Sequence, residues 1–457
     1  MTECFQNRGT YYEKSFEKKN SFSKIFRRCV MSRRSRYRRC LIWTFWVGVL
    51  FTIGFSYYYM ERVIPDRLSI VLEQEETLNL AMPVRLTLES ESEEVVLGGG
   101  SNIPSDQITI EKNEAISLYG KTQGSYQLGV DLFGMIRLKE IQVDVVDTQY
   151  VIPCGAPVGI YLKSNGVMVI GTGELINQNG TAVEPAAGIL KTGDYIEAIN
   201  GKPLSTKEQL ARAVEELEGQ DAVLTIRRQD KQMEVSVSPA VTQDGKSKLG
   251  VWVRSDTQGI GTMTYIDLNG RFGALGHGIS DTDTGEVVEI SEGNLYDTQI
   301  VGVEKGAVGS PGVMSGVIYY GPGTLLGDVN ANTEQGIFGT VNEKFMRDVT
   351  AESMEVGFKQ DVKKGKASIR SGVSGEIKDY EIEILKVDYS NSHSNKSLVI
   401  QVTDPELLEL TGGIVQGMSG SPIIQDGKLV GAVTHVFVND PTKGYGIFIE
   451  NMLDAAG

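Results

Sequence analysis

The distribution of apolar and polar positions divides this chain into stretches of different character. The first is residues 40–60, which carry no charged side chain and include three consecutive tyrosines, Tyr57 to Tyr59. About 20 apolar residues are enough for a helix to cross a bilayer, and tyrosine is typical of the membrane–water interface. No cleavage site built from small residues follows. We therefore expect an uncleaved transmembrane anchor rather than a removed signal peptide.

Residues 61–148 alternate short apolar runs with turns, as at Leu68–Leu72 and Val84–Leu88. Such runs predict short strands. The sequence GGGSN at Gly98–Asn102 predicts a flexible joint between them. We expect a small β domain or a stalk here.

The third stretch changes its period partway. It contains the sequence GILKTGDYIEAING (Gly188–Gly201), then a helical pattern with Ser205 as N-cap and Glu208 three residues later, then an apolar run at Ala222–Ile226. This order of strand, glycine turn, helix and strand resembles a bacterial PDZ domain of the kind found in exported proteases.

The resemblance implies a place for a peptide ligand. In PDZ domains a bound peptide adds a strand beside a helix, and loop N–H groups hold its carboxylate. Carried onto this sequence, the loop is Gly159, Ile160, Tyr161 and Leu162, and Leu210 faces the groove. For Leu210, a place in the domain core is an equally good interpretation.

Towards the C-terminus, short runs rich in β-branched residues recur between glycine turns without a long helical period. This spacing predicts a β-barrel or a sandwich pair. The expected fold is mainly β, with a basic arm (1–39), the anchor (40–60), a small β region (61–148), a PDZ domain (149–240) and a C-terminal β domain (241–457).

Charge adds an orientation to this organisation. Residues 1–39 carry a net charge of +9 and the remaining residues a net charge of −24. Lys and Arg beside an anchor favour the cytoplasmic side and anionic lipid headgroups, so we expect a cytoplasmic N-terminus and an extracytoplasmic remainder. The acidic remainder repels nucleic acid, which excludes nucleic acid as its partner.

Cysteine and histidine are too few for an internal disulfide or a metal centre. Cys4, Cys29 and Cys40 lie in the arm or at the membrane, which leaves Cys154 alone in the exported part as an inert thiol. The three histidines lack the spacing of zinc ligands, and no H-E-x-x-H sequence occurs. We expect neither a metal nor a cofactor.

The clearest chemical signal is GMSGSP at Gly417–Pro422. It resembles the nucleophile turn of trypsin-like serine peptidases, where glycines permit a tight turn and backbone N–H groups face the oxyanion. Asp426-Gly427 between apolar runs predicts a hairpin directly behind it. Ser419 is therefore the candidate nucleophile, and the alternative is a glycine-rich turn without chemistry.

A serine nucleophile needs a base to accept its proton. His393 lies in a polar loop, where we expect a solvated side chain. His435 lies on the return strand of the hairpin, and counting pairs from the turn places it on the face opposite Ser419, so we expect a packed strand residue. His277 ends a strand between two glycines and is the candidate base, with a plain loop histidine as the alternative.

The third group of such a triad is a carboxylate that orients the histidine. The residues alone leave its identity open, because many aspartates close strands in this region. The candidates are Asp281, Asp283, Asp297, Asp328, Asp348, Asp388 and Asp404.

The arm, one anchor, the PDZ module and a C-terminal domain with GALGHG and GMSGSPIIQDGKLVGAVTHVFVNDPTKGYGI together resemble the stage IV sporulation protein B family of endospore-forming bacteria. The resemblance is strongest over Gly412–Ile449. It implies a serine endopeptidase with His277, Asp404 and Ser419 as catalytic residues. By analogy with trypsin-like enzymes, the N–H groups of Gly417 and Ser419 would form the oxyanion hole, although the aspartate lies unusually close in sequence to the serine.

The family also implies a signalling role in the space between the forespore and mother-cell membranes. Its members cleave themselves and then a membrane-bound regulator of an intramembrane metalloprotease, which leads to activation of a late mother-cell sigma factor. Self-cleavage that releases the enzyme would have to fall before the PDZ region. The alternative is a non-enzymatic PDZ scaffold that tethers a sporulation membrane protein; only a peptidase requires His277 and Ser419 to lie close together.

Overall fold

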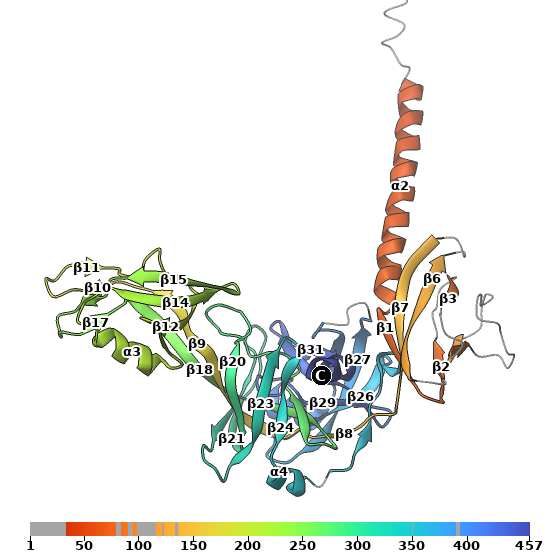
Figure 1. Ribbon diagram of the computed structural model, residues 1–457. Coiled ribbons are helices and arrows are strands. Elements are labelled where there is room, and N and C mark those ends of the chain that lie inside the picture. Colours follow the sequence, from red (N-terminus) through yellow and green to blue (C-terminus); the bar gives the residue numbers. More distant parts are fainter. Residues whose placement is uncertain are drawn as a thin grey trace, which may run out of the picture. The chain divides into compact units, whose positions relative to one another are not determined.

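The computed structural model describes residues 33–78, 84–89, 95–97, 116–120, 123–132, 136–349, 351–389 and 394–457 (Figure 1). Most of the basic arm, the joint expected at Gly98–Asn102, and His393 lie outside these residues. The chain divides into two compact units, Met1–Val63 and Ile64–Gly457.

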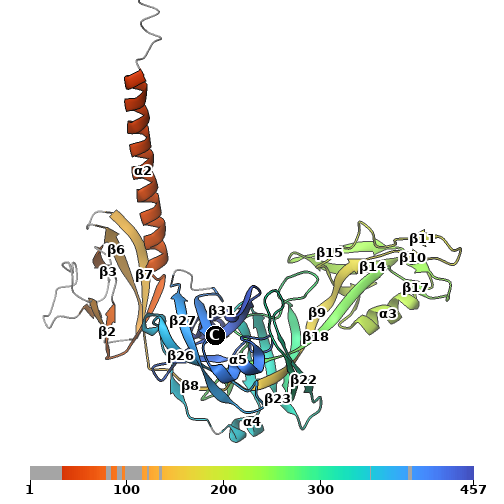
Figure 2. The same ribbon diagram turned by 180° about the vertical axis from the view of Figure 1, so that it is seen from behind.

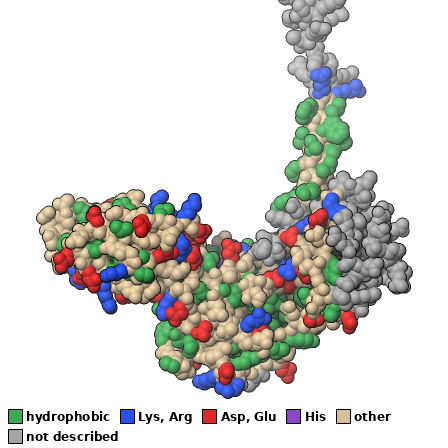
Figure 3. Space-filling view, viewed as in Figure 1, with side chains coloured by type: hydrophobic (Ala, Val, Ile, Leu, Met, Phe, Trp, Pro, Cys, Tyr) green, Lys and Arg blue, Asp and Glu red, His purple; other side chains and the backbone are tan. Residues whose placement is uncertain are grey.

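The first unit contains the helix expected to cross a membrane. Helix α2 (Arg33–Val63) includes the segment Tyr37–Tyr59, which is long and apolar enough to span a bilayer. Its large apolar side chains are exposed, Trp43 at 71% and Phe51 at 73%, and they cover the helix surface in Figure 3 with basic side chains at its N-terminal end. An apolar helix exposed in this way is consistent with a single-pass anchor.

The second unit begins with two small sheets, one with the order β1-β7-β6-β3 and one with the order β2-β5-β4. Leu128 of β6 and Ile141 of β7, which pair across the first sheet, are fully buried. The strands are β1 (Arg67–Val71), β2 (Glu75–Leu78), β3 (Val84–Glu89), β4 (Val95–Leu97), β5 (Ile116–Gly120), β6 (Gly124–Leu132) and β7 (Ile136–Val146).

The PDZ domain expected from the sequence is present. Helix α3 (Lys207–Glu215) packs Leu210 and Val214 into a core formed with the sheet. Its capping box uses Thr206 and Gln209, one residue later than the sequence pattern predicted. The strands of this domain are β10 (Leu175–Ile176), β11 (Ala182–Val183), β12 (Tyr195–Ile199), β13 (Lys202–Pro203), β14 (Ala222–Arg228), β15 (Lys231–Val237), β16 (Ala240–Val241) and β17 (Ser247–Lys248).

Two long strands join the PDZ domain to the next body. Strands β9 (Pro157–Thr172) and β18 (Val251–Asp267) pair with each other in two stretches, Met168–Thr172 with Val251–Arg254 and Pro157–Lys163 with Asp256–Thr262. In one half β9 also pairs with β12 of the PDZ domain, and in the other half it pairs with β20 (Ile290–Tyr296). Residues 150–163, expected in the PDZ domain, therefore belong to the neighbouring barrel, and β9 and β18 extend from one body into the other (Figure 1).

That neighbouring body is a ring of strands. Strands β9, β20, β23, β24, β19 and β18 pair in succession and the ring closes between β18 and β9. Apolar residues such as Leu162, Met263 and Leu295 fill it. Besides β9, β18 and β20, the elements of this body are β8 (Tyr150–Pro153), β19 (Arg271–Ala274), β21 (Thr298–Glu304), β22 (Val313–Ile318), β23 (Leu325–Thr333), β24 (Gly336–Val341), α4 (Glu343–Asp348) and β25 (Met354–Glu355).

The last body is a closed barrel with the order β26-β27-β28-β31-β30-β29. Figure 2 shows it from behind with α5 beside it. The C-terminal β domain expected over 241–457 is thus two barrels, and the first of them also takes strands from before the PDZ domain. Its elements are η1 (Lys359–Asp361), β26 (Gly365–Ser371), β27 (Lys378–Val387), β28 (Leu398–Val402), α5 (Pro405–Thr411), β29 (Pro422–Gln425), β30 (Lys428–Phe437), β31 (Asp440–Phe448) and α6 (Ile449–Ala456).

Candidate active site

Ser419 lies on a tight turn that enters the hairpin of β29 and β30. The hairpin forms at Asp426-Gly427 as predicted, and both residues have positive φ (51° and 79°), the signature of a type I′ turn. The Oγ of Ser419 donates a hydrogen bond to the carbonyl oxygen of Thr434 on the return strand, at 2.7 Å. The hydroxyl is thus held against β30 and not against a histidine in this structure.

The turn is fastened to the first barrel by Thr262, a residue of β18. The Thr262 hydroxyl donates to the carbonyl oxygen of Gly417 at 2.8 Å, and its N–H donates to the carbonyl oxygen of Ser419 at 3.0 Å. Gly420 permits this approach, because a Cβ there would lie 2.0 Å from the Thr262 oxygen. Nothing in the sequence around Thr262 distinguishes it from an ordinary strand residue, so sequence reasoning missed it.

The backbone of the turn leaves two donors without a protein acceptor. Met418 N–H bonds to Val415 and Gly420 N–H bonds to Val433, whereas the N–H groups of Gly417 and Ser419 make no hydrogen bond within the described residues. Gly417 has φ +102°, which a side chain would disfavour. Two free N–H groups on such a turn are what an oxyanion hole requires.

The neighbouring serine is not an alternative nucleophile in this arrangement. Ser421 is fully buried, and its Oγ atom is enclosed without a hydrogen-bond partner. Ser419 is partly exposed. Of the two serines in GMSGSP, only Ser419 has a hydroxyl that a substrate can reach.

His277 lies beside this turn and strand β30, on the loop that follows β19. The adjacent Gly276 packs on Thr434, where an added Cβ would lie 2.9 Å from the threonine methyl group. Nδ1 of His277 lies 2.8 Å from the carbonyl oxygen of Gly278. A carbonyl only accepts, which assigns the proton to Nδ1 and leaves Nε2 with its lone pair. Burial lowers the pKa of His277, and the Gly278 hydrogen bond opposes part of that effect.

His435 also lies in the site, contrary to the expectation of a strand residue packed on the face opposite Ser419. Its ring centroid is 4.9 Å from that of His277, with the planes tilted by 36°. The pair count failed because the β29–β30 register shifts between Ile423 and Ile424, which displaces every later position by one. The histidine in the return strand was the available signal, and the bulge concealed its meaning.

Among the described residues, no hydrogen bond joins Asp404 to His277. Its carboxylate caps helix α5, accepting from Leu407 N at 3.0 Å and from Glu381 N at 3.2 Å. The resemblance assigned Asp404 a triad role, whereas the local sequence Asp-Pro-Glu makes it an N-cap.

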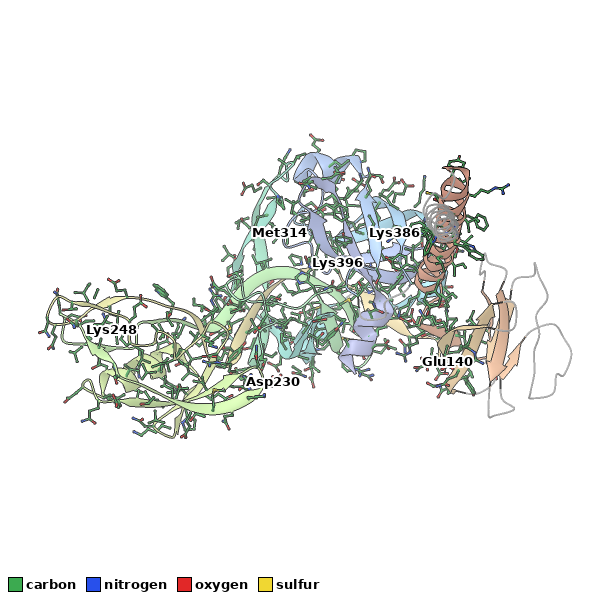
Figure 4. The ribbon with its side chains drawn as sticks, turned by 90° about the horizontal axis from the view of Figure 1, so that it is seen from above. Glu140, Asp230, Lys248, Met314, Lys386 and Lys396 are labelled. Atoms are coloured by element: carbon green, nitrogen blue, oxygen red, sulfur yellow. The ribbon has the colours of Figure 1, made fainter. Side chains whose placement is uncertain are left out.

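The segment expected to hold a peptide lies in the neighbouring barrel and not at a free edge of the PDZ sheet. Gly159–Leu162 cannot accept an added strand, because β18 and β20 pair with the two edges of this segment. A pocket of about 500 Å³ lies between α3 and the segment Lys246–Val253, and Leu210 both lines it and packs in the domain core. Lys248, on the rim of this pocket, is labelled in Figure 4.

The Cys154 thiol adds no chemistry to this site. Burial raises the pKa of the Cys154 thiol to about 12, so it stays protonated, which agrees with an inert residue. In the part of the chain that the structure describes, no group of three or more His, Cys, Asp and Glu side chains is placed to hold a metal ion. Met314 and Lys396, labelled in Figure 4, flank the site: Met314 packs beneath Gly417, and Lys396 lies 5.5 Å from the ring of Tyr445.

Comparison with known proteins finds family matches for two stretches of the chain. Residues 245–453 match the SpoIVB peptidase S55 family, and residues 162–241 match the PDZ domain of Tricorn protease. Similar solved structures include the PDZ domains of SdrC-like proteins from Listeria monocytogenes (19% identity, 20% of this chain and 87% of that chain, TM-score 0.16) and Listeria innocua (24%, 20% and 93%, TM-score 0.17). No curated protein matches the chain.

Proposed function

Because this chain belongs to the SpoIVB peptidase family and is a serine peptidase with a PDZ domain, we propose that Ser419 is its nucleophile and His277 its general base. The observation that carries the assignment is the pair of free N–H groups, Gly417 and Ser419, beside an accessible Ser419 hydroxyl. The Nδ1–H tautomer of His277, with Nε2 available, supports it further.

The reaction follows from these positions. A rotation about χ1 moves the Ser419 hydroxyl from the Thr434 carbonyl to Nε2 of His277, which takes the proton as Oγ attacks the scissile carbonyl. The oxyanion accepts hydrogen bonds from the N–H groups of Gly417 and Ser419. His277 then protonates the leaving amine, and water activated in the same way hydrolyses the acyl-enzyme.

In this scheme two contacts take the place of the aspartate of a conventional triad. One is the hydrogen bond between His277 and the Gly278 carbonyl, and the other is the helix cap formed by Asp404. The carbonyl of Gly278 fixes the tautomer of His277, which is the orienting part of the carboxylate's task. Asp404 acts at a distance by holding the first turn of α5, the helix that leads into the Gly412–Gln416 segment before the nucleophile. It is a positioning residue for that segment.

The family relationship extends the proposal to substrates and place. The enzyme cleaves itself before the PDZ region and then cleaves a membrane-bound regulator of an intramembrane metalloprotease, leading to sigma factor activation during sporulation. Helix α2 anchors it with the N-terminus in the cytoplasm and the barrels in the intermembrane space. The groove beside α3 binds a peptide segment of a protein partner.

The test uses the full chain in detergent micelles, as wild type, Ser419→Ala and the matched control Ser421→Ala. A fluorophosphonate reports the nucleophile, because Oγ forms a bond to phosphorus as fluoride leaves. We expect labelling at Ser419 and self-cleavage fragments from wild type and Ser421→Ala, and neither from Ser419→Ala, by intact mass.

Absence of labelling in the wild-type chain would refute the assignment of Ser419. Fragments from all three chains would show that another protease made them, and labelling of Ser419→Ala at Ser421 would transfer the role to that residue.

A further inference from the structure

The hydrogen bond that orients His277 ends on a peptide unit whose other side is also bonded. Nδ1 of His277 donates to the carbonyl oxygen of Gly278 at 2.8 Å. The N–H of the same peptide unit belongs to Ile279, and it donates to Oδ1 of Asn332 at 2.9 Å. The C=O and the N–H of a trans peptide point in opposite directions, so His277 and Asn332 lie on opposite sides of one planar amide.

Asn332, a half-buried residue of β23, is fixed in this position by further contacts. Its Nδ2 donates to the carbonyl oxygens of Ile279 at 2.9 Å and Val288 at 2.8 Å, which belong to the two sides of a short hairpin. An amide oxygen accepts and an amide nitrogen donates, so these bonds permit one orientation of the side chain. The next residue, Thr333, packs on Gly278, where an added Cβ would lie 2.4 Å from the threonine carbonyl oxygen. Strand β23 therefore contacts the peptide unit that holds the base.

These contacts form a chain of hydrogen bonds that ends at the base. It runs from Nδ1–H of His277 through the Gly278–Ile279 peptide to Oδ1 of Asn332. An amide that donates from its nitrogen is a stronger acceptor at its oxygen, because resonance joins the two atoms and successive hydrogen bonds polarise one another. A stronger acceptor at Nδ1 keeps the proton there, leaves Nε2 free for the serine, and stabilises the imidazolium that forms when the serine proton arrives.

We propose that Asn332 is a positioning residue for the general base, which holds and polarises the Gly278–Ile279 peptide so that a neutral amide performs the task of a triad carboxylate. The inference rests on the proposed role of His277. An amide carries no full charge, so it stabilises an imidazolium less than a carboxylate does. The pKa of His277 agrees with this, because burial lowers it and the Gly278 hydrogen bond offsets only part of that effect.

The groups around His277 determine how its titration is measured. His435 packs on its ring, with 4.9 Å between the centroids. Burial, with smaller contributions from His277 and Lys396, lowers the pKa of His435 to about 4, so this neighbour is neutral at higher pH. The hairpin that follows His277 carries Asp281 and Asp283 at its turn, and both pair with Arg254 of β18 (ion pairs to each carboxylate).

The test compares Asn332→Leu, which keeps the side-chain volume without hydrogen bonds, with Asn332→Asp, which keeps an oxygen facing the Ile279 N–H and, when ionised, loses both donated bonds. Arg254→Met is the matched control, because it unfastens the same hairpin at its turn and leaves the peptide unit alone. Fluorophosphonate labelling of the full chain in detergent, followed against pH, gives the maximal rate, the half-saturating concentration and the acid limb. Far-UV circular dichroism and melting temperature establish that each variant is folded.

We expect Asn332→Leu to lower the maximal labelling rate by about 10-fold or more with an unchanged half-saturating concentration, as loss of an outer hydrogen-bond partner does for metal-bound histidines. Its acid limb should move to lower pH, because a weaker Gly278 acceptor stabilises the imidazolium less. Asn332→Asp should recover most of the rate, with its acid limb at or above the wild-type pH. Arg254→Met should keep the wild-type rate and acid limb, even with a lower melting temperature.

A rate and an acid limb in Asn332→Leu equal to wild type overturn the proposal, and so does an equal loss in Asn332→Asp. The same loss in Arg254→Met also overturns it, since a loosened hairpin would then be a sufficient cause. Should Asn332→Leu fail to fold, Asn332→Asp decides: an acid limb at or above the wild-type pH supports the chain of hydrogen bonds, and one at lower pH refutes it. Labelling of His277→Ala at the wild-type rate is a separate result, since it refutes the proposed base itself.

Discussion

At the scale of single residues, Asp404 allows a helix N-cap to be distinguished from a triad acid. Both of its carboxylate oxygens accept backbone N–H groups, from Leu407 and Glu381. An N-cap needs an acceptor and not a charge, whereas a triad acid needs its charge and its acceptor geometry toward the histidine. The two roles therefore respond differently to the same substitutions.

We expect Asp404→Asn to label at Ser419 within about 10-fold of wild type, because asparagine caps helices as well as aspartate does. Asp404→Ala should lose about 1 kcal/mol of stability with the cap. A triad acid would instead lose activity by about 10⁴-fold in the Asn variant. Labelling rates and urea unfolding of the three chains distinguish these outcomes.

The lowered pKa of His277 gives a second prediction at this scale. With His277 as the proposed base, the active form is the neutral ring, so we expect activity above the pKa of His277 and its loss as pH falls through that pKa. Because burial places that pKa below its ordinary value of 6.5, the labelling rate should fall to half at a pH below 6.5. Rates measured between pH 4 and 8 test this; a midpoint above 6.5 would contradict the burial of a neutral base.

Residue types and local order were enough to predict the Asp426-Gly427 hairpin and to propose Ser419 and His277 as catalytic residues, because each depends on neighbours in sequence. The contacts of His435 and Asp404 were not predicted, because they involve residues far away in the sequence. The bulge at Ile423/Ile424 places His435 at the site. The Asp404 carboxylate, which caps α5, also accepts a hydrogen bond from the N–H of Glu381 in β27. Thr262 gave no signal at all, since only the pairing of two barrels gives it a function.

At the scale of elements, the nucleophile turn depends on the closeness of β18. Gly420 has φ +95°, and an added Cβ would meet the Thr262 carbonyl oxygen and the backbone of Leu275. Gly427 in the hairpin also has a positive φ, of 79°, but an added Cβ there meets nothing within 4 Å. The two glycines share the conformational requirement and differ in the steric one.

We expect Gly420→Ala to abolish labelling of Ser419, because the turn must move away from Thr262 to admit the methyl group. Gly427→Ala should cost about 1 kcal/mol, the ordinary penalty for a left-handed alanine, and keep the labelling rate. Equal rates in the two variants would contradict a turn held in place by β18.

At the scale of the whole molecule, the chain combines an apolar helix with an acidic body. The PDZ and barrel elements were predicted from sequence as separate neighbours, and their order along the chain was right. Their connection was not predicted, because the local pattern of β9 reads the same whether its partner is β12 or β20. Strand pairing depends on residues far apart in the sequence, so a domain boundary drawn at residue 149 from local patterns could not account for it.

We expect the full chain to remain with membranes after carbonate extraction and a chain lacking residues 1–60 to be released, because Tyr37–Tyr59 supplies the apolar segment. When the chain is expressed in non-sporulating cells stripped of their wall, external protease should digest the barrels and spare the arm. Digestion of the arm alone would reverse the proposed orientation.

Strand β18 has a consequence for how the two ends of the enzyme communicate. Its first residues, Val251–Val253, line the peptide groove, and about 30 Å further along Thr262 holds the nucleophile turn. A peptide that shifts this strand changes the turn, and by thermodynamic linkage an occupant of the turn changes peptide affinity by the same factor. A reversible boronate on Ser419 should therefore alter peptide binding in the groove as much as the peptide alters boronate binding. Peptide binding and cleavage would then be coupled through the same conformational equilibrium. A substrate that engages both sites would be favoured at each of them.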